Sequence, residues 1–337
     1  MDVPAWAWIA FVAFIIAMLG IDLFLHRDHH AVTVKEAATW SLVWVVMGTS
    51  FGGVIWWLEG STLATEYITG YLIEKSLSVD NIFVFALIFS YFAVPLKFQH
   101  NVLFWGIFGA LVFRAFFIFA GIALLNQFHW MIYVFGAFLI ATGIRMFFHK
   151  DEDIHPERNP VLKALRRIMP ISNNYDEAKF FTVENGKRLA TPLLAVLVVV
   201  ETTDIIFAVD SIPAILAITQ DQFLVFSSNA FAILGLRALY FLLAGIMDRF
   251  IYLKSGLAVV LIYVGIKMLL GGLGFHINTV VSLVVIAVTL TIAVVASLKA
   301  TTPEERDRLA KEKTDRVEEG PEAAADEPST EQENRPV

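Results

Sequence analysis

Long apolar segments alternate with short polar ones along most of this chain. A helix needs about 20 apolar residues to cross the hydrocarbon core of a bilayer. Segments of this kind are found at nine places, and we expect each to be a transmembrane helix: 6–25, 38–58, 70–94, 101–123, 129–148, 191–218, 222–246, 254–272 and 277–298. The pattern predicts an all-α polytopic membrane protein whose bundle covers residues 1–298.

Lys and Arg are distributed unevenly between the predicted loops. They occur after the first, third, fifth, seventh and ninth predicted helices, whereas the other four loops contain none. Basic residues are concentrated in the cytoplasmic loops of membrane proteins. We therefore expect the N-terminus to lie outside the cytoplasm and the C-terminus inside it.

Two segments on the predicted cytoplasmic side lie outside the bundle. Loop 149–190 is charged, and Val161–Met169 within it is expected to form a short basic amphipathic helix. The charged tail, 299–337, is rich in Glu, Asp, Ala, Pro and Thr, and we expect it to be mostly disordered. Both segments are suited to protein partners.

Composition supports the membrane class and narrows the chemistry. Hydrophobic residues make up 57% of the chain and its mean hydropathy is +0.67, whereas soluble domains have about 45–50% apolar residues. The absence of cysteine excludes disulfides and thiol catalysis. No phosphate-binding loop, hydrolase motif or basic nucleic-acid-binding domain is found. We expect no enzymatic activity, no cofactor and no nucleic-acid partner.

The third and sixth predicted helices carry the same acidic signature. The pattern [Glu/Asp]-x4-Val-Asp-[Asn/Ser]-Ile occurs once from Glu74 to Ile82 and again from Asp204 to Ile212. Glu201 comes three residues before the second copy. A carboxylate in the membrane interior costs several kcal/mol, and such residues usually mark an ion or proton path. The two signatures therefore predict a cation site between two halves of the bundle.

The similarity extends to the helices that follow each signature. Arg114-Ala in the fourth predicted helix matches Arg237-Ala in the seventh, and Gly143-Ile-Arg matches Gly265-Ile-Lys at the ends of the fifth and eighth. A unit with an odd number of spans enters its second copy from the opposite side. Helices 3–5 and 6–8 are thus predicted to form an inverted repeat with its site at the interface. Coincidence among apolar helices is the alternative.

Helix geometry separates the acids of each signature. Positions seven apart share a helical face, while positions six apart lie about 120° from each other. The first acid is therefore aligned with the Asn or Ser of the signature, and the second acid points elsewhere. Because a straight helix does not aim all these groups at one ion, Pro213 favours local unwinding of the sixth helix. We expect the third and sixth helices to cross at their Asp-containing middles.

The signatures supply only oxygen ligands, which suit the hard cations Mg²⁺, Ca²⁺ and Mn²⁺. The predicted metal ligands are Glu74, Asp80, Asn81, Glu201, Asp204, Asp210 and Ser211. The predicted charge-balancing residues are Arg114, Arg237, Lys75 and Lys267. Under the alternative reading, these acids and bases only hold the bundle together.

A weaker candidate lies near the end of the first predicted helix. Asp22 and His26 are four residues apart, which places them one turn apart on one face. A metal would enter the path or be sensed there. The alternative is a solvated cluster at the membrane interface.

The segments Glu74–Phe85 and Val200–Ala214 resemble the TerC family, which includes the Alx-type proteins and is placed in a lysine-exporter-like superfamily. The resemblance covers roughly residues 1–298. It implies a protein of the bacterial cytoplasmic (inner) membrane that is linked to manganese export and tellurium resistance. It also implies that the ion path contains Glu74, Asp80, Asp204 and Asp210.

Our leading hypothesis is a secondary transporter that exports Mn²⁺ through this carboxylate site. No ATP site is found, so an ion gradient or the membrane potential would drive it. One alternative is a membrane scaffold or protein-insertion factor that acts through loop 149–190 and the tail. Another is an exporter of a different solute, such as an amino acid or calcium.

Overall fold

A computed structural model describes residues 3–25, 33–148, 159–172, 175–176, 178–184, 186–243 and 252–300. His26 and residues 301–337 of the predicted tail lie outside this part of the chain. Its helices are α1 (Ala5–Leu25), α2 (Val34–Glu59), α3 (Ser61–Tyr91), α4 (Leu96–Gln127), α5 (Met131–Phe148), α6 (Pro160–Ile168), α7 (Pro192–Leu216), α8 (Gln222–Leu234), α9 (Leu236–Leu243), α10 (Leu253–Gly272) and α11 (Thr279–Ala300). A two-stranded antiparallel sheet is formed by β1 (Phe181–Glu184) and β2 (Lys187–Ala190).

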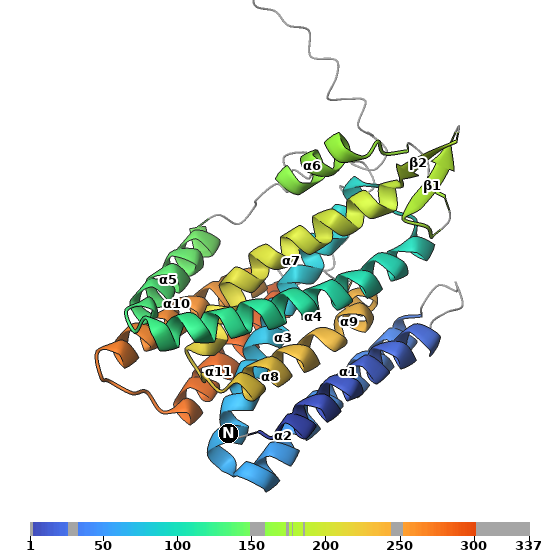
Figure 1. Ribbon diagram of the computed structural model, residues 1–337. Coiled ribbons are helices and arrows are strands. Elements are labelled where there is room, and N and C mark those ends of the chain that lie inside the picture. Colours follow the sequence, from blue (N-terminus) through green and yellow to red (C-terminus); the bar gives the residue numbers. More distant parts are fainter. Residues whose placement is uncertain are drawn as a thin grey trace, which may run out of the picture.

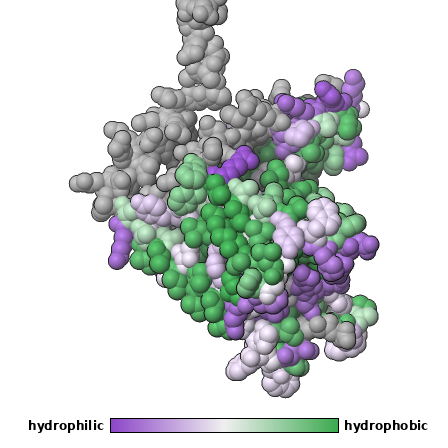
Figure 2. All heavy atoms as spheres, turned by 90° about the vertical axis from the view of Figure 1, so that its left-hand side faces the viewer, coloured by the Kyte–Doolittle hydropathy of each residue, from purple (hydrophilic) through white to green (hydrophobic). Residues whose placement is uncertain are grey.

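The all-α membrane architecture is confirmed. Within the described residues seven helices are long and apolar enough to cross a membrane, and the bent pair α8–α9 adds an eighth. The helix α3 is not among them, although it has 31 residues, since it contains four charged residues. Each of the nine predicted segments overlaps one helix or the α8–α9 pair. Figure 2 shows a broad, continuous hydrophobic face of the kind that lipid covers.

The helices pack around α3. This helix contacts α2, α7, α8 and α11, while α4 runs beside α7 and α5 lies against α10 (Figure 1). The predicted repeat matches α3 with α7, α4 with the α8–α9 pair, and α5 with α10. Under this matching, the contact between α3 and α8 corresponds to the contact between α7 and α4, and both contacts are present. This pair of contacts is compatible with the inverted repeat, which stays a prediction.

Glycines allow the closest helix contacts. A Cβ on Gly143 of α5 would lie 2.8 Å from the Ala258 carbonyl of α10, and one on Gly265 of α10 would lie 2.8 Å from the Gly136 carbonyl of α5. Small residues let helix backbones approach closely within a membrane. The matched glycines of the two predicted repeats therefore serve to pack α5 and α10 together.

The prediction that Pro213 unwinds its helix is wrong. The helix α7 is continuous from Pro192 to Leu216, with Pro213 in its last turn. A proline at this position removes only the backbone hydrogen bond to Val209, and the residues from Ser211 to Leu216 are all buried by neighbouring helices. Packing therefore holds the helix together across the proline.

The break lies instead in the segment 222–246, which was predicted to be one span. Here α8 and α9 meet at Gly235 with a bend of 40°. A Cβ on Gly235 would lie 2.8 Å from the Cβ of Trp44 and 3.0 Å from Nζ of Lys75. Lys75 Nζ donates to the Ala232 carbonyl at 3.1 Å. The bend thus gives a buried lysine a backbone acceptor.

The loop between α5 and α7 is more structured than predicted. Its expected amphipathic helix is present as α6, capped by the Asn159 side chain, with Leu162 buried in the bundle core. The β1–β2 hairpin was not predicted, and Gly186 supplies its positive φ of 75°. The Tyr175 hydroxyl donates to the Phe92 carbonyl at 2.7 Å. This loop is therefore anchored on one end of the bundle.

Candidate cation site

Arg114 of α4 joins the two signature helices at the centre of the bundle. Its guanidinium donates from Nε to Asp204 Oδ2 at 3.3 Å and from Nη2 to Asp204 Oδ1 at 3.1 Å. Nη1 forms an ion pair with Glu74 and donates to Ser211 Oγ at 3.3 Å. The guanidinium of Arg114 thus binds the first acid of each signature, Glu74 on α3 and Asp204 on α7.

These groups are removed from solvent. Glu74 is 0% exposed, Arg114 1% and Asp204 2%. Buried charges are stable only when they are paired, and removing one partner of such a pair is strongly destabilising. The predicted charge-balancing contact of Arg114 is therefore present, and it involves both signatures.

Glu201 adds a third acid beside this pair. It lies one helical turn before Asp204 and interacts electrostatically with it. Its carboxylate packs directly against Gly109 of α4, where a Cβ would overlap it. Glu201 Oε2 is buried and has no hydrogen-bond partner among the described residues. With Glu74, Glu201 and Asp204 all ionised, the single charge of Arg114 would leave two negative charges uncompensated.

Further polar atoms without partners follow Glu74 along α3. Ser78 Oγ and Asn81 Nδ2 are buried and make no hydrogen bond within the described part of the chain. They come about one and two turns after Glu74, so all three occupy one side of the helix. Buried polar atoms that lack a partner cost free energy. Asn81, one of the predicted ligands, therefore lies on the side of α3 that carries Glu74.

The second acid of each signature lies away from Arg114, as helix geometry predicted. Asp210 Oδ1 accepts a hydrogen bond from the Thr142 hydroxyl of α5 at 3.3 Å and interacts electrostatically with Arg145. Asp80 interacts electrostatically with Lys254 of α10. These two acids therefore face the α5–α10 pair, and each has a basic residue in its surroundings.

The predicted ligands are thus distributed over two places in this structure. Within the described residues, no three acidic or histidine side chains lie close enough together to hold a metal ion. The aligned pair Asp204 and Ser211 does share one face, since both contact Arg114. In the state described, the guanidinium of Arg114 lies between the acids that were predicted to hold the cation.

The other basic residues were predicted to balance the signatures, and the structure pairs them elsewhere. Arg237 forms a buried ion pair with Asp22 of α1 and contacts His100 Nδ1 at 2.9 Å. Lys267 interacts electrostatically with Glu66, near the start of α3. Arg237 lies two residues after the bend at Gly235 and reaches α1 and not the signatures. Asp22 is accordingly a buried partner of a base and not a solvated interfacial group.

His100 was not identified from the sequence. It lies in the first turns of α4, and its sequence neighbours, Gln99 and Asn101, do not form a recognisable motif. Gln99 Oε1 accepts a hydrogen bond from the Tyr240 hydroxyl at 2.9 Å. Together with Arg237 and Asp22, these residues join α1, α4 and α9 at one end of the bundle.

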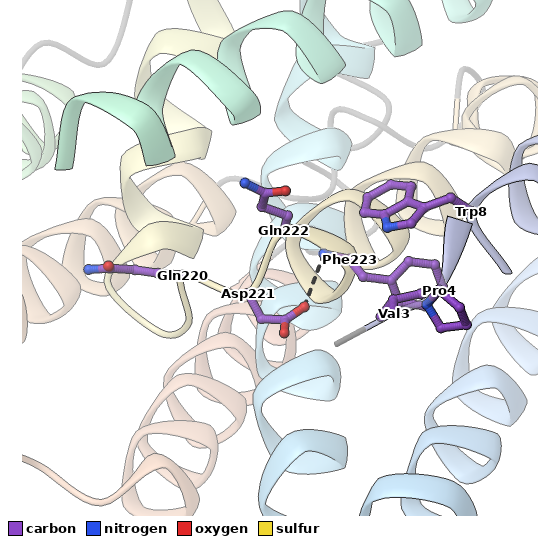
Figure 3. A pocket seen from close by; sticks show the side chains of 7 residues that line it. All are labelled: Val3, Pro4, Trp8, Gln220, Asp221, Gln222 and Phe223. Carbon is purple, nitrogen blue, oxygen red and sulfur yellow. Dashed lines mark hydrogen bonds between the residues drawn. The ribbon is translucent and has the colours of Figure 1, made fainter. Parts of the chain in front are cut away.

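A pocket of about 500 Å³ lies elsewhere, between the start of α1 and the turn that joins α7 to α8. Figure 3 shows Trp8, Phe223 and Asp221 around it. The carboxylate of Asp221 accepts from the backbone N–H of Phe223 at 3.0 Å, which caps α8. Because this acid is used as a helix cap and the signature residues are absent, the pocket is not the predicted cation site.

Comparison with known proteins shows the family of this chain. The profile of the integral membrane protein TerC family matches residues 59–307. An uncharacterized membrane protein of Myxococcus xanthus is 53% identical over 293 residues, which cover 86% of this chain and 91% of the relative. The "Putative membrane-bound redox modulator Alx" of Escherichia coli (strain K12) is 48% identical over 289 residues, covering 83% of this chain and 90% of the relative. No solved structure matches. The chain therefore belongs to the TerC family of integral membrane proteins.

Proposed function

We propose that this protein is a secondary transporter that exports a divalent metal cation, with Mn²⁺ as its substrate. The observation that supports it best is the bridge from Arg114 to Glu74 on α3 and Asp204 on α7. Ionisable residues inside membrane-spanning helices usually mark an ion path. Here they come from the two matching halves of the bundle and meet at a single, fully buried point.

The charges of this cluster suit a carrier with an empty and a loaded state. In the empty state the single charge of Arg114 is shared between the carboxylates of Glu74 and Asp204 and offsets one of their two charges. A divalent cation brings two positive charges, which balance the two acids once Arg114 has moved away. Glu201 and Ser211 add oxygen atoms beside them. Exchange of guanidinium for metal then changes the buried charge by one unit, toward neutrality.

The nature of the ligands favours a hard cation. Carboxylate, hydroxyl and amide oxygens bind Mg²⁺, Ca²⁺ and Mn²⁺, and the resemblance to the TerC family favours Mn²⁺ among them. The link to tellurium resistance belongs to the same resemblance. The chain has no cysteine, so an effect on cellular redox state would come from metal export and not from thiols of this protein.

The contacts between helices support transport through two inverted halves. The proposed exchange of α3 with α7 converts the contact between α3 and α8 into the contact between α7 and α4, and both are present. Such repeats place the substrate near the midplane, at the interface between the halves. The bridge made by Arg114 lies at this interface, between α3 and α7. We place the protein in the bacterial inner membrane, with the anchored loop and the C-terminus in the cytoplasm.

Manganese flux into proteoliposomes tests the proposal. The wild type is compared with Asp204→Asn and Glu74→Gln, and Glu59→Gln serves as the control because Glu59 is exposed at the end of α2. We expect flux in the wild type and the control and little in the two other variants. A well-folded wild type that moves no Mn²⁺ would rule the function out. Competition by Ca²⁺ and Mg²⁺ measures selectivity.

A second candidate function is a membrane scaffold or insertion factor. It is supported by the exposed basic side chains of Lys163, Arg166 and Arg167 on α6, which is itself fixed to the bundle through Leu162. Replacing the three basic residues by Gln would abolish such a function and leave cation flux unchanged. The two readouts therefore separate this candidate from the transporter.

A further inference from the structure

We propose that Asn229 of α8 is a ligand of the transported cation and supplies a neutral oxygen to the site at Arg114. This inference rests on the proposed transport function. Asn229 is 1% exposed, and neither Oδ1 nor Nδ2 has a hydrogen-bond partner in the described part of the chain. An amide that is buried without partners in a membrane-spanning bundle costs free energy on both atoms.

The neighbours of Asn229 show that this is not general along α8. Ser227 donates to the Leu224 carbonyl at 3.3 Å, and Ser228 donates to the Val225 carbonyl at 3.1 Å. Both hydroxyls are thereby satisfied within their own helix. The amide of Asn229, in contrast, has no hydrogen-bond partner among the described residues.

Helix directions place Asn229 at the level of the ion pair. Gly106 of α4 approaches Val200 of α7, and further along Gly121 approaches Leu216, so α4 and α7 run parallel. The chain reverses direction after α7, which makes α8 antiparallel to both (Figure 1). A step forward along α8 is therefore a step backward along α4.

Buried apolar residues of α8 and α4 indicate the direction of that step. Val225 of α8 and Ile118 of α4 belong to one buried apolar cluster. One turn forward from Val225 is Asn229, and one turn backward from Ile118 is Arg114. Because α4 and α8 are antiparallel, Asn229 and Arg114 both lie toward the same end of the bundle from these two residues.

Two contacts with α3 give the level of Asn229. A Cβ on Gly70 of α3 would lie 3.2 Å from Ser228 Oγ, so Ser228 faces α3 one turn before Glu74. Lys75 reaches the carbonyl of Ala232, which shows that α3 and α8 run in the same direction. Asn229 lies between these two contacts along α8.

An amide oxygen suits the charge of this site. Amide carbonyls are normal ligands of hard cations and add no charge. Glu74, Glu201 and Asp204 already exceed Arg114 in charge, so a fourth carboxylate would bind the cation too tightly for release. Asn229 adds a ligand from α8. This helix contacts α3 and α4, and α3 and α4 in turn contact α7, which carries Glu201 and Asp204.

The test compares three variants in proteoliposomes and in detergent. Asn229→Leu removes both polar atoms at nearly the same size, Asn229→Asp keeps Oδ1, and Ser228→Ala is the control on the adjacent position. We measure three quantities for each variant: the initial Mn²⁺ flux, its dependence on Mn²⁺ concentration, and the melting temperature without metal. The melting temperature reports whether Asn229 is needed only for folding.

For a ligand, we expect Asn229→Leu to lose about ten-fold to a hundred-fold in flux or apparent Mn²⁺ affinity, with a melting temperature equal to or above that of the wild type. Asn229→Asp, which adds a fourth carboxylate, should bind Mn²⁺ more tightly and carry a lower maximal flux, and Ser228→Ala resembles the wild type. Wild-type flux in Asn229→Leu overturns the inference while leaving the transport function intact. A loss of flux that accompanies a lower melting temperature also overturns it, because Asn229 is then structural. Absence of flux in the wild type overturns both proposals.

Discussion

Arg114 and Asp204 are 90 residues apart in the chain and are joined by two hydrogen bonds, of 3.1 and 3.3 Å, inside the bundle. The paired geometry explains why a membrane helix tolerates an aspartate in its middle. Because the same guanidinium also binds Glu74, any cation that enters between the two acids must compete with it. Under the proposed function, stability and transport therefore depend on the same side chain in opposite ways.

Replacing Arg114 by Gln leaves the carboxylates of Glu74 and Asp204 buried without a cation. Breaking a buried ion pair by removing one partner costs about 3–5 kcal/mol, so we expect a lower melting temperature in detergent. Mn²⁺ should recover more of this loss in the variant than it adds to the wild type. Arg166→Gln on exposed α6 is the control. Equal stability of the variant and wild type without metal would contradict the pairing.

The acids that face α5 and α10 provide the second prediction. Asp210 is held by one hydrogen bond from Thr142, and Asp80 by electrostatic interaction with Lys254. Asp80→Asn and Asp210→Asn keep side-chain shape and should cost less stability than Asp204→Asn. If both acids line the path, each variant should still lose most of its Mn²⁺ flux. Wild-type flux in both variants would remove these acids from the path.

Gly109 gives a test of Glu201 that leaves every acid in place. A Cβ at this position would overlap the carboxylate of Glu201, so Gly109→Ala must displace it from beside Asp204. We expect reduced Mn²⁺ flux and weaker apparent affinity. Gly53→Ala on α2 is the matched control, since no atom lies within 4 Å of its Cβ position. Alanine there favours the helix by about 0.5–1 kcal/mol, so the control should be equally or more stable.

Much of the site could be predicted from the sequence because its signals are local. Charged residues in apolar runs are rare, so the signatures at Glu74 and Asp204 identified the centre of the bundle. Helical periodicity alone separated Asp210 from Ser211. The structure agrees with both predictions, because Ser211 contacts Arg114 and Asp210 contacts Thr142.

The remaining features depend on tertiary contacts that no local pattern contains. Gly235 looks like any glycine in an apolar helix, and the bend there follows from Trp44 and Lys75 on other helices. Asn229 is part of a Ser-Ser-Asn run that resembles ordinary polar residues at a helix interface. Pro213 carried a clear local signal for unwinding, and packing overrode it. Such residues become informative only when their neighbours are known.

The pair of Asp22 and Arg237 ties α1 to α9, and a double-mutant cycle measures how strongly. Asp22→Asn and Arg237→Gln each leave a buried charge with fewer partners, and each should lower the melting temperature in detergent. The double variant removes both charges, so its loss should be smaller than the sum of the single losses. Coupling energies between contacting residues are about 0.5–3 kcal/mol. Additive losses would show that the two side chains act independently. Arg237 also contacts His100, so Arg237→Gln should be the more damaging of the two single changes.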